Sequence, residues 1–201
     1  MICLAYYVLY SFTNTLQRLD LVEFERDQWQ RPLDVVRALR EGHTVADLGA
    51  GSGYFSLKLS SAVGDRGHVL AVDIRKLSLF FLWARALLRG QHNVRVIVGT
   101  EDNPRLPIGA VDAVLICNTY HEFRNPDMVI NQTFRSLRRG GRLVVVDRAR
   151  RANAAEQAHE VLFNVVESEL RQNGFEIVTQ DDHFIDRSGD NAWWLVKGRK
   201  P

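Results

Sequence analysis

Short apolar runs without polar alternation recur through the middle of the chain, and stretches with helical spacing separate them. The apolar runs are residues 44–48, 69–72, 94–98, 111–116 and 143–146, and the helical stretches are 54–63, 76–89 and 126–138. Continuous apolar strands are typical of a parallel sheet that is covered on both faces. The alternation therefore predicts a doubly wound α/β domain with right-handed crossovers.

The last quarter of the chain has a different pattern. Residues 154–172 have apolar positions at helical spacing, and strands are expected after them at 175–180 and 192–197. The connection between these strands is too short for a parallel crossover, so we expect an antiparallel pair. No linker or repeat divides the chain. We expect one domain over residues 24–201, with the N-terminal residues 1–23 packed on it.

Two segments are unusually apolar. Residues 1–17 carry no charged side chain, and residues 77–88 read LSLFFLWARALL. Both are shorter than the roughly 20 residues that span a bilayer, and the first lacks the positive start of a secretory signal. We interpret the first as a helix or strand packed on the domain. The second is expected to be a helix covered by that segment or by a second subunit, with a membrane-adjacent surface as the alternative.

Composition and charge exclude several classes of protein. The chain has 201 residues and a net charge of +2, which does not indicate a nucleic-acid-binding protein. Its two cysteines, Cys3 and Cys117, lie far apart, which excludes a disulfide framework and a zinc finger and is typical of the cytoplasm. Seven arginines between residues 135 and 151 indicate a solvated surface or, alternatively, an anion-binding patch. We expect a cytoplasmic monomer or homodimer without a bound metal.

The strongest chemical signal is a glycine-rich turn between a strand and a helix, VADLGAGSGYF at residues 45–55. In an open α/β sheet the ligand binds at the carboxyl ends of the strands, and the first strand-to-helix turn is the usual place. The spacing is GxGxG, and Tyr54 stands where a dinucleotide-binding loop needs its third glycine. A nucleoside without a pyrophosphate therefore fits this turn better than a nicotinamide dinucleotide.

Acidic residues end the next two strands. Asp73 follows the second strand, where a carboxylate can accept from both hydroxyls of a ribose. Glu101 and Asp102 follow the third strand, where one of them can accept from an adenine amino group. A single acid at a strand end is more simply a helix cap, but acids at successive strand ends favour a nucleoside site.

Four motifs together resemble those of class I S-adenosylmethionine-dependent methyltransferases. VADLGAGSGYF, VLAVDI, DAVLICNTYHEF and LRRGGRLVVVD follow one another in the order and spacing of that family, over about residues 24–198. The resemblance is to the ubiquinone/menaquinone-biosynthesis type and related bacterial methyltransferases. It implies a mostly parallel, seven-stranded, Rossmann-like sheet with an antiparallel last strand, S-adenosyl-L-methionine as cofactor and S-adenosyl-L-homocysteine as product.

The resemblance also implies which residues bind the cofactor. These positions are Asp47, Gly49, Ala50, Gly51, Gly53, Tyr54, Asp73, Ile74, Glu101, Asp102 and Asn118. The glycines would pass under the methionine part, and Asp47 would orient their turn or reach the amino group. Asp73 would bind the ribose, Ile74 would pack on the adenine, and Asn118 would lie beside the sulfonium.

The acceptor side is less well defined by the sequence. Methyl transfer is an in-line displacement that depends mainly on alignment, although a base helps when the acceptor is a phenol, enol or amine. Tyr120, His121 and Glu122 follow the fourth strand, and His121 has the most suitable pKa. We predict Tyr120 and His121 as catalytic candidates, and the alternative is that this segment only shapes the pocket.

These observations predict a methyltransferase that acts on an oxygen, carbon or nitrogen of a small molecule. The alternatives are a methyltransferase of RNA or protein, a nicotinamide oxidoreductase, and a non-catalytic homologue that binds the cofactor. We expect no nucleic-acid partner and no membrane span, and peripheral membrane contact stays open.

Overall fold

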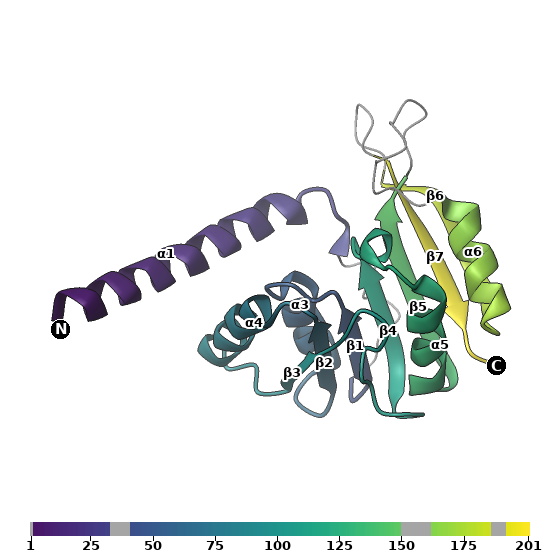
Figure 1. The fold of residues 1–201 in the computed structure, drawn as a ribbon, viewed down its shortest axis with the longest axis horizontal. Helices are drawn as coiled ribbons and strands as arrows, with labels where there is room; N and C mark the ends of the chain where they lie inside the picture. The colour runs from purple at the N-terminus through teal and green to yellow at the C-terminus, as the bar shows by residue number, and fades with distance from the viewer. Residues whose placement is uncertain (1, 33–40, 150–161, 186–191) are drawn as a thin grey trace.

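The computed structural model describes residues 2–32, 41–149, 162–185 and 192–201, which form a central sheet with helices on both faces (Figure 1). The strand order in the seven-stranded sheet is β3-β2-β1-β4-β5-β7-β6. The strands are β1 Thr44–Leu48, β2 His68–Asp73, β3 Val94–Val98, β4 Val111–Cys117, β5 Leu137–Arg148, β6 Glu176–Ile185 and β7 Trp193–Arg199. Strands β1 to β5 pair in parallel, whereas β7 runs antiparallel to both of its neighbours. The predicted sheet, with its antiparallel last strand, is confirmed.

The helices lie in two layers, which gives the inner strands β1, β2 and β4 a core on either side, whereas the edge strand β3 stays partly exposed. The helices are α1 Ile2–Asp27, α3 Tyr54–Val63, α4 Lys76–Leu88, the 3-10 helix η1 Tyr120–Glu122, α5 Pro126–Ser136 and α6 Phe163–Gln172. Val45 of β1 packs in one core with Phe55 of α3, whereas the next residue, Ala46, packs in the other with Ile130 of α5. This double burial is the reason that the strands are continuous apolar runs.

Several predicted boundaries differ from the structure, including that of β5, which begins at Leu137 rather than at residue 143. Helix α5 ends at Ser136 rather than at residue 138, because Leu137 is fully buried and already pairs with Val111 of β4. Strand β6 continues to Ile185, five residues beyond its predicted end at 180. Of the helix expected at 154–172, the described part is α6, and residues 154–161 lie outside the described residues.

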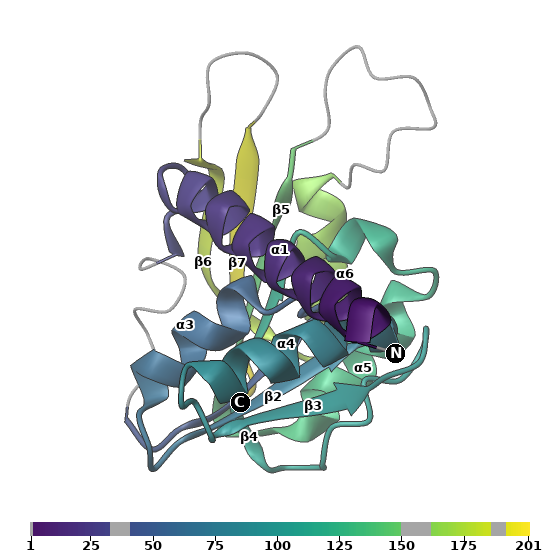
Figure 2. The same cartoon turned by 90° about the vertical axis from the view of Figure 1, so that its left-hand side faces the viewer.

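Helix α1 contains the apolar N-terminal segment and continues without a break through residue 23 to Asp27. It lies across α4 in Figure 2. The ring of Phe12 on α1 stacks on that of Phe81 on α4, with 5.8 Å between the ring centroids. The cover is partial, since Trp83 and Leu88 of α4 remain 49% and 70% exposed. None of the helices in the described part of the chain has the length and apolar character needed to cross a membrane.

Candidate functional site

The glycine-rich turn joins β1 to α3 at the carboxyl end of the sheet. Gly49, Gly51 and Gly53 have φ angles of 75°, 54° and 99°, a region that favours glycine. A Cβ atom on Gly49 would lie 2.2 Å from the side chain of Thr119, whereas one on Gly51 would meet nothing within 4 Å. The turn is therefore packed tightly at its start and open above Gly51.

The carboxylate of Asp73 holds this turn in place from the end of β2. Its Oδ2 atom accepts the Gly51 N–H at 2.8 Å, and its Oδ1 atom accepts the Arg75 N–H at 2.8 Å. The Arg75 guanidinium lies on the same carboxylate, with Nε 3.2 Å from Oδ1. The Asp73 side chain is only 3% exposed, but that of Arg75 is 58% exposed, so the arginine can turn away without disturbing the core.

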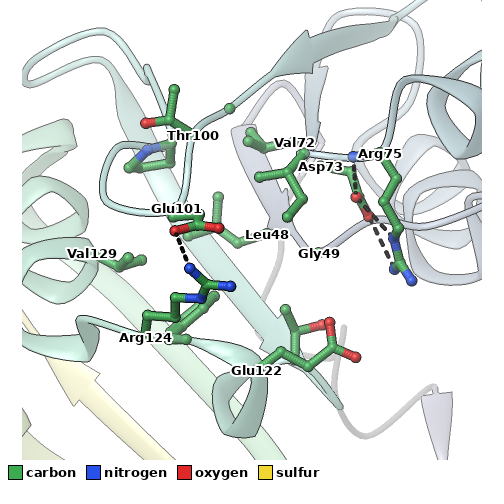
Figure 3. A pocket seen from close by; sticks show the side chains of 15 residues that line it. Leu48, Gly49, Val72, Asp73, Arg75, Thr100, Glu101, Glu122, Arg124 and Val129 are labelled. Atoms are coloured by element: carbon green, nitrogen blue, oxygen red, sulfur yellow. Dashed lines mark hydrogen bonds and ion pairs between the residues drawn. The ribbon is translucent and has the colours of Figure 1, made fainter.

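A first cavity, here called the β2 pocket, has a volume of about 270 Å³ and lies beside the ends of β1, β2 and β3 (Figure 3). Asp73, the last residue of β2, and Ile74, which follows it, line this pocket, and Glu101 lines it from the segment after β3. Glu101 pairs with Arg124 across the pocket, with 3.3 Å between Oε2 and Nη1. The carboxylates of Asp73 and Glu101, which lie at or just after the ends of two neighbouring strands, thus line one cavity, as expected from the sequence for a nucleoside site.

A second cavity of about 500 Å³, here called the α1 pocket, lies between the glycine-rich turn and helix α1. Asp47, Gly51 and Asn118 line it from the sheet side, and Leu19 and Arg26 line it from α1. The two pockets adjoin, because they have four lining residues in common: Gly49, Arg75, Thr119 and Glu122.

Asp47 is a buried carboxylate on the wall of the α1 pocket. It is 2% exposed, and its Oδ2 atom accepts the Ser56 hydroxyl at 2.6 Å. Burial raises the pKa of Asp47 to about 6, and the nearby negative charge of Asp73 acts in the same direction. A cationic group in the α1 pocket would offset this cost and favour the ionised carboxylate.

The structure brings most of the predicted cofactor-binding residues to the two pockets. The β2 pocket includes Gly49, Asp73, Ile74 and Glu101, and the α1 pocket includes Asp47, Gly49, Ala50, Gly51, Tyr54 and Asn118. Gly53, the last glycine of the turn, lines neither pocket. A Cβ atom on Gly53 would lie 2.7 Å from the side chain of Leu82. Asp102 lines neither of these pockets, and its Oδ1 atom accepts the Asn125 amide at 2.5 Å.

The predicted catalytic residues lie outside the linings of both pockets. Tyr120 is 2% exposed, and its hydroxyl donates to Glu169 of α6. His121 Nδ1 lies 2.9 Å from Oδ1 of the fully buried Asp147, and this hydrogen bond raises the pKa of His121. Glu122, the third member of the segment, is the one that lines both pockets, and its Oε1 lies 4.0 Å from His121 Nε2.

Three residues of the site were missed by the sequence analysis. Thr119 packs over Gly49, Arg75 covers Asp73, and Arg26 of α1 places its guanidinium carbon 3.8 Å from the ring centre of Tyr54. Thr119 directly follows Asn118, so its position in the third motif, DAVLICNTYHEF, was a usable signal. Arg26 had none, because only tertiary packing brings α1 to the turn.

Comparison with known proteins places the chain in a family. The sequence model of the ubiE/COQ5 methyltransferase family matches residues 10–172. The chain belongs to this family. It is thus a member of the class I S-adenosylmethionine-dependent methyltransferases, as its motifs predicted.

Curated relatives match part of the chain. The ubiquinone/menaquinone biosynthesis C-methyltransferase UbiE of Vibrio campbellii is 31% identical over 122 residues, which are 59% of this chain and 46% of that protein. UbiE of Azotobacter vinelandii is 29% identical over 127 residues, or 63% of this chain and 50% of the relative. The chain therefore matches about half the length of these relatives.

Solved structures share the fold. A SAM-dependent methyltransferase from Aquifex aeolicus superposes with a TM-score of 0.79 at 23% identity, covering 94% of this chain and 98% of that one. The cyclase SpnF superposes with a TM-score of 0.74 at 21% identity, covering 85% and 80% of the two chains. At these identities the likeness concerns the fold, which proteins of different activity share.

S-adenosylmethionine is the cofactor of this family, and the described residues fit it. The buried Asp47 carboxylate, with its raised pKa, suits the cofactor's ammonium group, and the turn is open above Gly51. Asp73 and Glu101 line the β2 pocket with carboxylate oxygens, which suit the hydroxyl and amino groups of a nucleoside. The adjoining pockets suit the nucleoside and methionine parts of one molecule.

Proposed function

We propose that this protein transfers the methyl group of S-adenosylmethionine to a small aromatic or enolic acceptor that enters the α1 pocket. The observation that carries the proposal is the junction of the two pockets at Gly49 and Thr119, with the acidic side chain of Glu122 beside it. When bound, the cofactor supplies a methyl carbon made electrophilic by the adjacent sulfonium. Family membership supports this activity.

The described residues would act mainly by binding and alignment. Asp47 would hold the ammonium group, the glycine-rich turn would let the methionine part approach the backbone, and Asp73 would accept from the ribose hydroxyls in place of Arg75. Alignment of this kind accounts for a large part of the acceleration of a bimolecular displacement. Thr119, which packs on Gly49, would keep the turn in the geometry that this alignment needs.

We propose Glu122 as the general base for an acceptor that loses a proton. Its side chain is 55% exposed and lines both pockets, whereas that of His121 is 9% exposed and lines neither. We propose that His121 acts as a positioning residue, because Asp147 fixes its ring through Nδ1 and leaves Nε2 on the side of Glu122. The acceptor's proton would pass to the Glu122 carboxylate as the new bond to the methyl carbon forms.

The apolar wall of the α1 pocket supports an aromatic acceptor. Leu19 of α1, Phe55 of α3 and both Leu77 and Phe81 of α4 line this pocket together with the polar residues of the turn. The curated relatives are C-methyltransferases of ubiquinone and menaquinone biosynthesis by name, which supports a quinol-type acceptor methylated at carbon. We therefore rank small molecules above RNA or protein acceptors.

Two measurements test the proposal. The first is calorimetric titration with S-adenosylmethionine and S-adenosylhomocysteine, with NADH as the control. We expect micromolar binding of the first two ligands, equivalent to about 8 kcal/mol, and none of NADH. The second is an assay of methyl transfer from labelled cofactor to simple hydroquinones and naphthoquinols. Binding of NADH alone, or cofactor binding with transfer only to RNA or protein, would contradict the proposal.

A further inference from the structure

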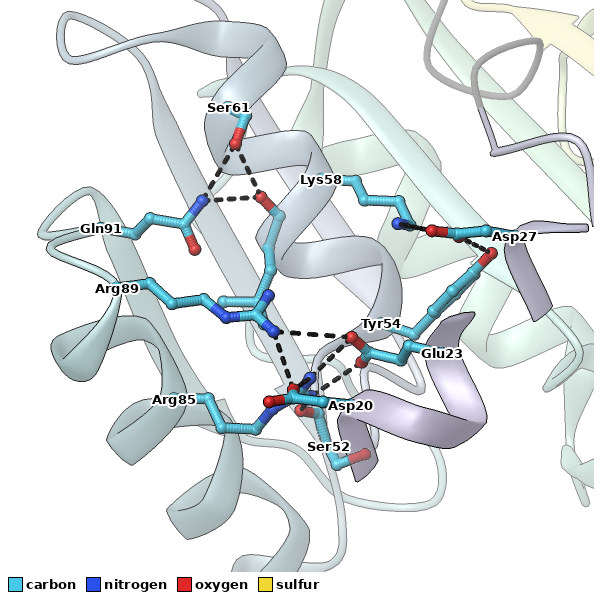
Figure 4. Close-up of polar contacts among 11 residues, drawn as sticks. Asp20, Glu23, Asp27, Ser52, Tyr54, Lys58, Ser61, Arg85, Arg89 and Gln91 are labelled. Atoms are coloured by element: carbon cyan, nitrogen blue, oxygen red, sulfur yellow. Dashed lines mark hydrogen bonds and ion pairs between the residues drawn. The ribbon is translucent and has the colours of Figure 1, made fainter. Parts of the chain in front are cut away.

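Arg85 of α4 lies between helix α1 and the glycine-rich turn, and its side chain is only 2% exposed (Figure 4). Its Nη1 atom donates to the carbonyl oxygen of Ser52, in the turn, at 2.6 Å. The same Nη1 atom donates to Oε1 of Glu23, on α1, at 2.8 Å. One buried guanidinium therefore joins the turn to the helix.

Two acidic residues of α1 complete this contact. Glu23 accepts from both terminal nitrogens of Arg85, the second bond being 2.6 Å long, and Asp20 accepts from Nη2 at 2.9 Å. Arg89, which directly follows α4, also donates to Asp20, at 2.8 Å, so two arginines at the end of α4 face two acids of α1. A buried cation that loses its anionic partners is strongly destabilising, so Arg85 opposes any separation of α1 from α4.

The position of α1 determines the shape of the α1 pocket. Thr15, Leu19 and Arg26 line this pocket from the helix, and Ser52 lines it from the turn. Arg26 packs on the ring of Tyr54, and Asp27 accepts the hydroxyl of that tyrosine at 2.7 Å. Helix α1 is thus a wall of the pocket that would receive the methionine part, and it touches the turn at more than one point.

We propose that Arg85 is a positioning residue that couples the docking of helix α1 to the conformation of the cofactor-binding turn. The inference rests on the proposed function, because the ligand that reports the coupling is the cofactor product. When the bound cofactor orders the turn, it also fixes the Ser52 carbonyl. The Arg85 guanidinium donates to this carbonyl and to Asp20 and Glu23, so it is fixed as well. Because coupling between two sites is reciprocal, a docked α1 in turn strengthens cofactor binding.

Amide hydrogen exchange of the unaltered chain tests the coupling directly. Saturating S-adenosylhomocysteine should slow exchange of α1 amides between Thr15 and Asp27 by about tenfold, within the usual range of such couplings. Bound ligand with unchanged α1 exchange would overturn the coupling and leave the proposed function intact. Absence of ligand binding would overturn the proposed function and the coupling together.

A charge-removing variant provides the second test. Asp20→Asn combined with Glu23→Gln should weaken S-adenosylhomocysteine binding by about tenfold and abolish the ligand-dependent slowing of exchange in α1. Arg85→Lys should have the same effects, because an ammonium group lacks the forked geometry that reaches Ser52 and Glu23 together. A purely structural role would change exchange equally with and without ligand, and that result would overturn the proposal.

The matched control is Glu41→Gln. It removes an exposed ion pair of similar length, with Glu41 Oε1 2.7 Å from Arg66 Nη2 and both side chains more than half exposed. Neither residue lines the β2 or the α1 pocket. Ligand affinity and α1 exchange should stay unchanged in this variant. A tenfold loss of affinity in the control as well would overturn the assignment to Arg85.

Discussion

Two neighbouring regions at the same edge of the sheet carry polar side chains with different partners. The first region is the ends of β1 and β2, and the second is the ends of β4 and β5. Asp47 and Asp73 line the pockets, and they are held by a hydroxyl, backbone N–H groups and the exposed Arg75. Tyr120 and His121 are held by acidic side chains from other elements, Glu169 and Asp147.

This difference separates binding residues from supporting ones. A polar group whose partner is a backbone amide or an exposed side chain still has capacity for a ligand, whereas one paired with the carboxylate of another element is already satisfied. The first region therefore suits ligand binding, and the second fixes the segment that carries Glu122. Four predictions test this comparison, from the largest expected effect to the smallest.

Asp73→Ala should weaken S-adenosylhomocysteine binding at least a hundredfold. The variant removes the carboxylate that we propose as the acceptor of two ribose hydroxyls, and hydrogen bonds to a charged group contribute about 1.5–3 kcal/mol each. Calorimetry gives the dissociation constants. Asp112→Ala is the control, since Asp112 also accepts a backbone N–H, that of Thr44, but lines neither pocket. Equal losses in both variants would mean that Asp73 acts through stability alone.

His121→Gln should lower the free energy of unfolding by about 1.5–3 kcal/mol at pH 6 and by less at pH 9. The hydrogen bond to Asp147 raises the pKa of His121, so its contribution is complete below the ordinary histidine pKa and is lost as pH rises through the folded-state pKa. Urea denaturation at both pH values measures the difference. The exposed His68 provides the control variant, His68→Gln. An equal loss at pH 6 and pH 9 would contradict this linkage.

Asp47→Asn should weaken S-adenosylhomocysteine binding about tenfold at pH 7, the equivalent of one charged contact. In the unaltered protein, affinity should fall as the pH drops below about 6, because burial raises the pKa of Asp47 to about 6 and the protonated carboxyl does not attract an ammonium group. The variant should lose this pH dependence. Calorimetry between pH 5 and pH 7 tests it, and a pH dependence retained in the variant would assign the titration to another group.

Arg75→Ala should strengthen S-adenosylhomocysteine binding by about threefold. The guanidinium occupies acceptor positions on Asp73 that the ribose hydroxyls would need in the proposed complex, and an ion pair with one exposed partner contributes about 1 kcal/mol or less. Arg75→Lys is the matched control, because a lysine keeps the charge but not the forked contact. Weaker binding in the alanine variant would mean that Arg75 contacts the ligand rather than competing with it.

The fold was predictable from the sequence to the level of single strands. The inner parallel strands β1, β2 and β4 are buried on both faces, so they consist of consecutive apolar residues that can be recognised without knowledge of their neighbours. Boundaries were less predictable where tertiary pairing overrides local preference. Leu137 was expected near the end of the helix at 126–138, but it pairs with Val111 of β4. Trp193 and Trp194 are adjacent in β7 and pack in different cores, because successive side chains of a strand point to opposite faces of the sheet.

The sequence by itself determined the sheet, the glycine-rich turn and the acids at the strand ends, because each depends on local backbone geometry or on residues adjacent in the chain. Only the tertiary structure decided that Glu122 rather than Tyr120 or His121 faces the pockets, and that Arg85 joins α1 to the turn. Those outcomes depend on which buried partner satisfies each polar group. Such partners lie far away in sequence, as Asp147 does from His121 and Glu23 from Arg85.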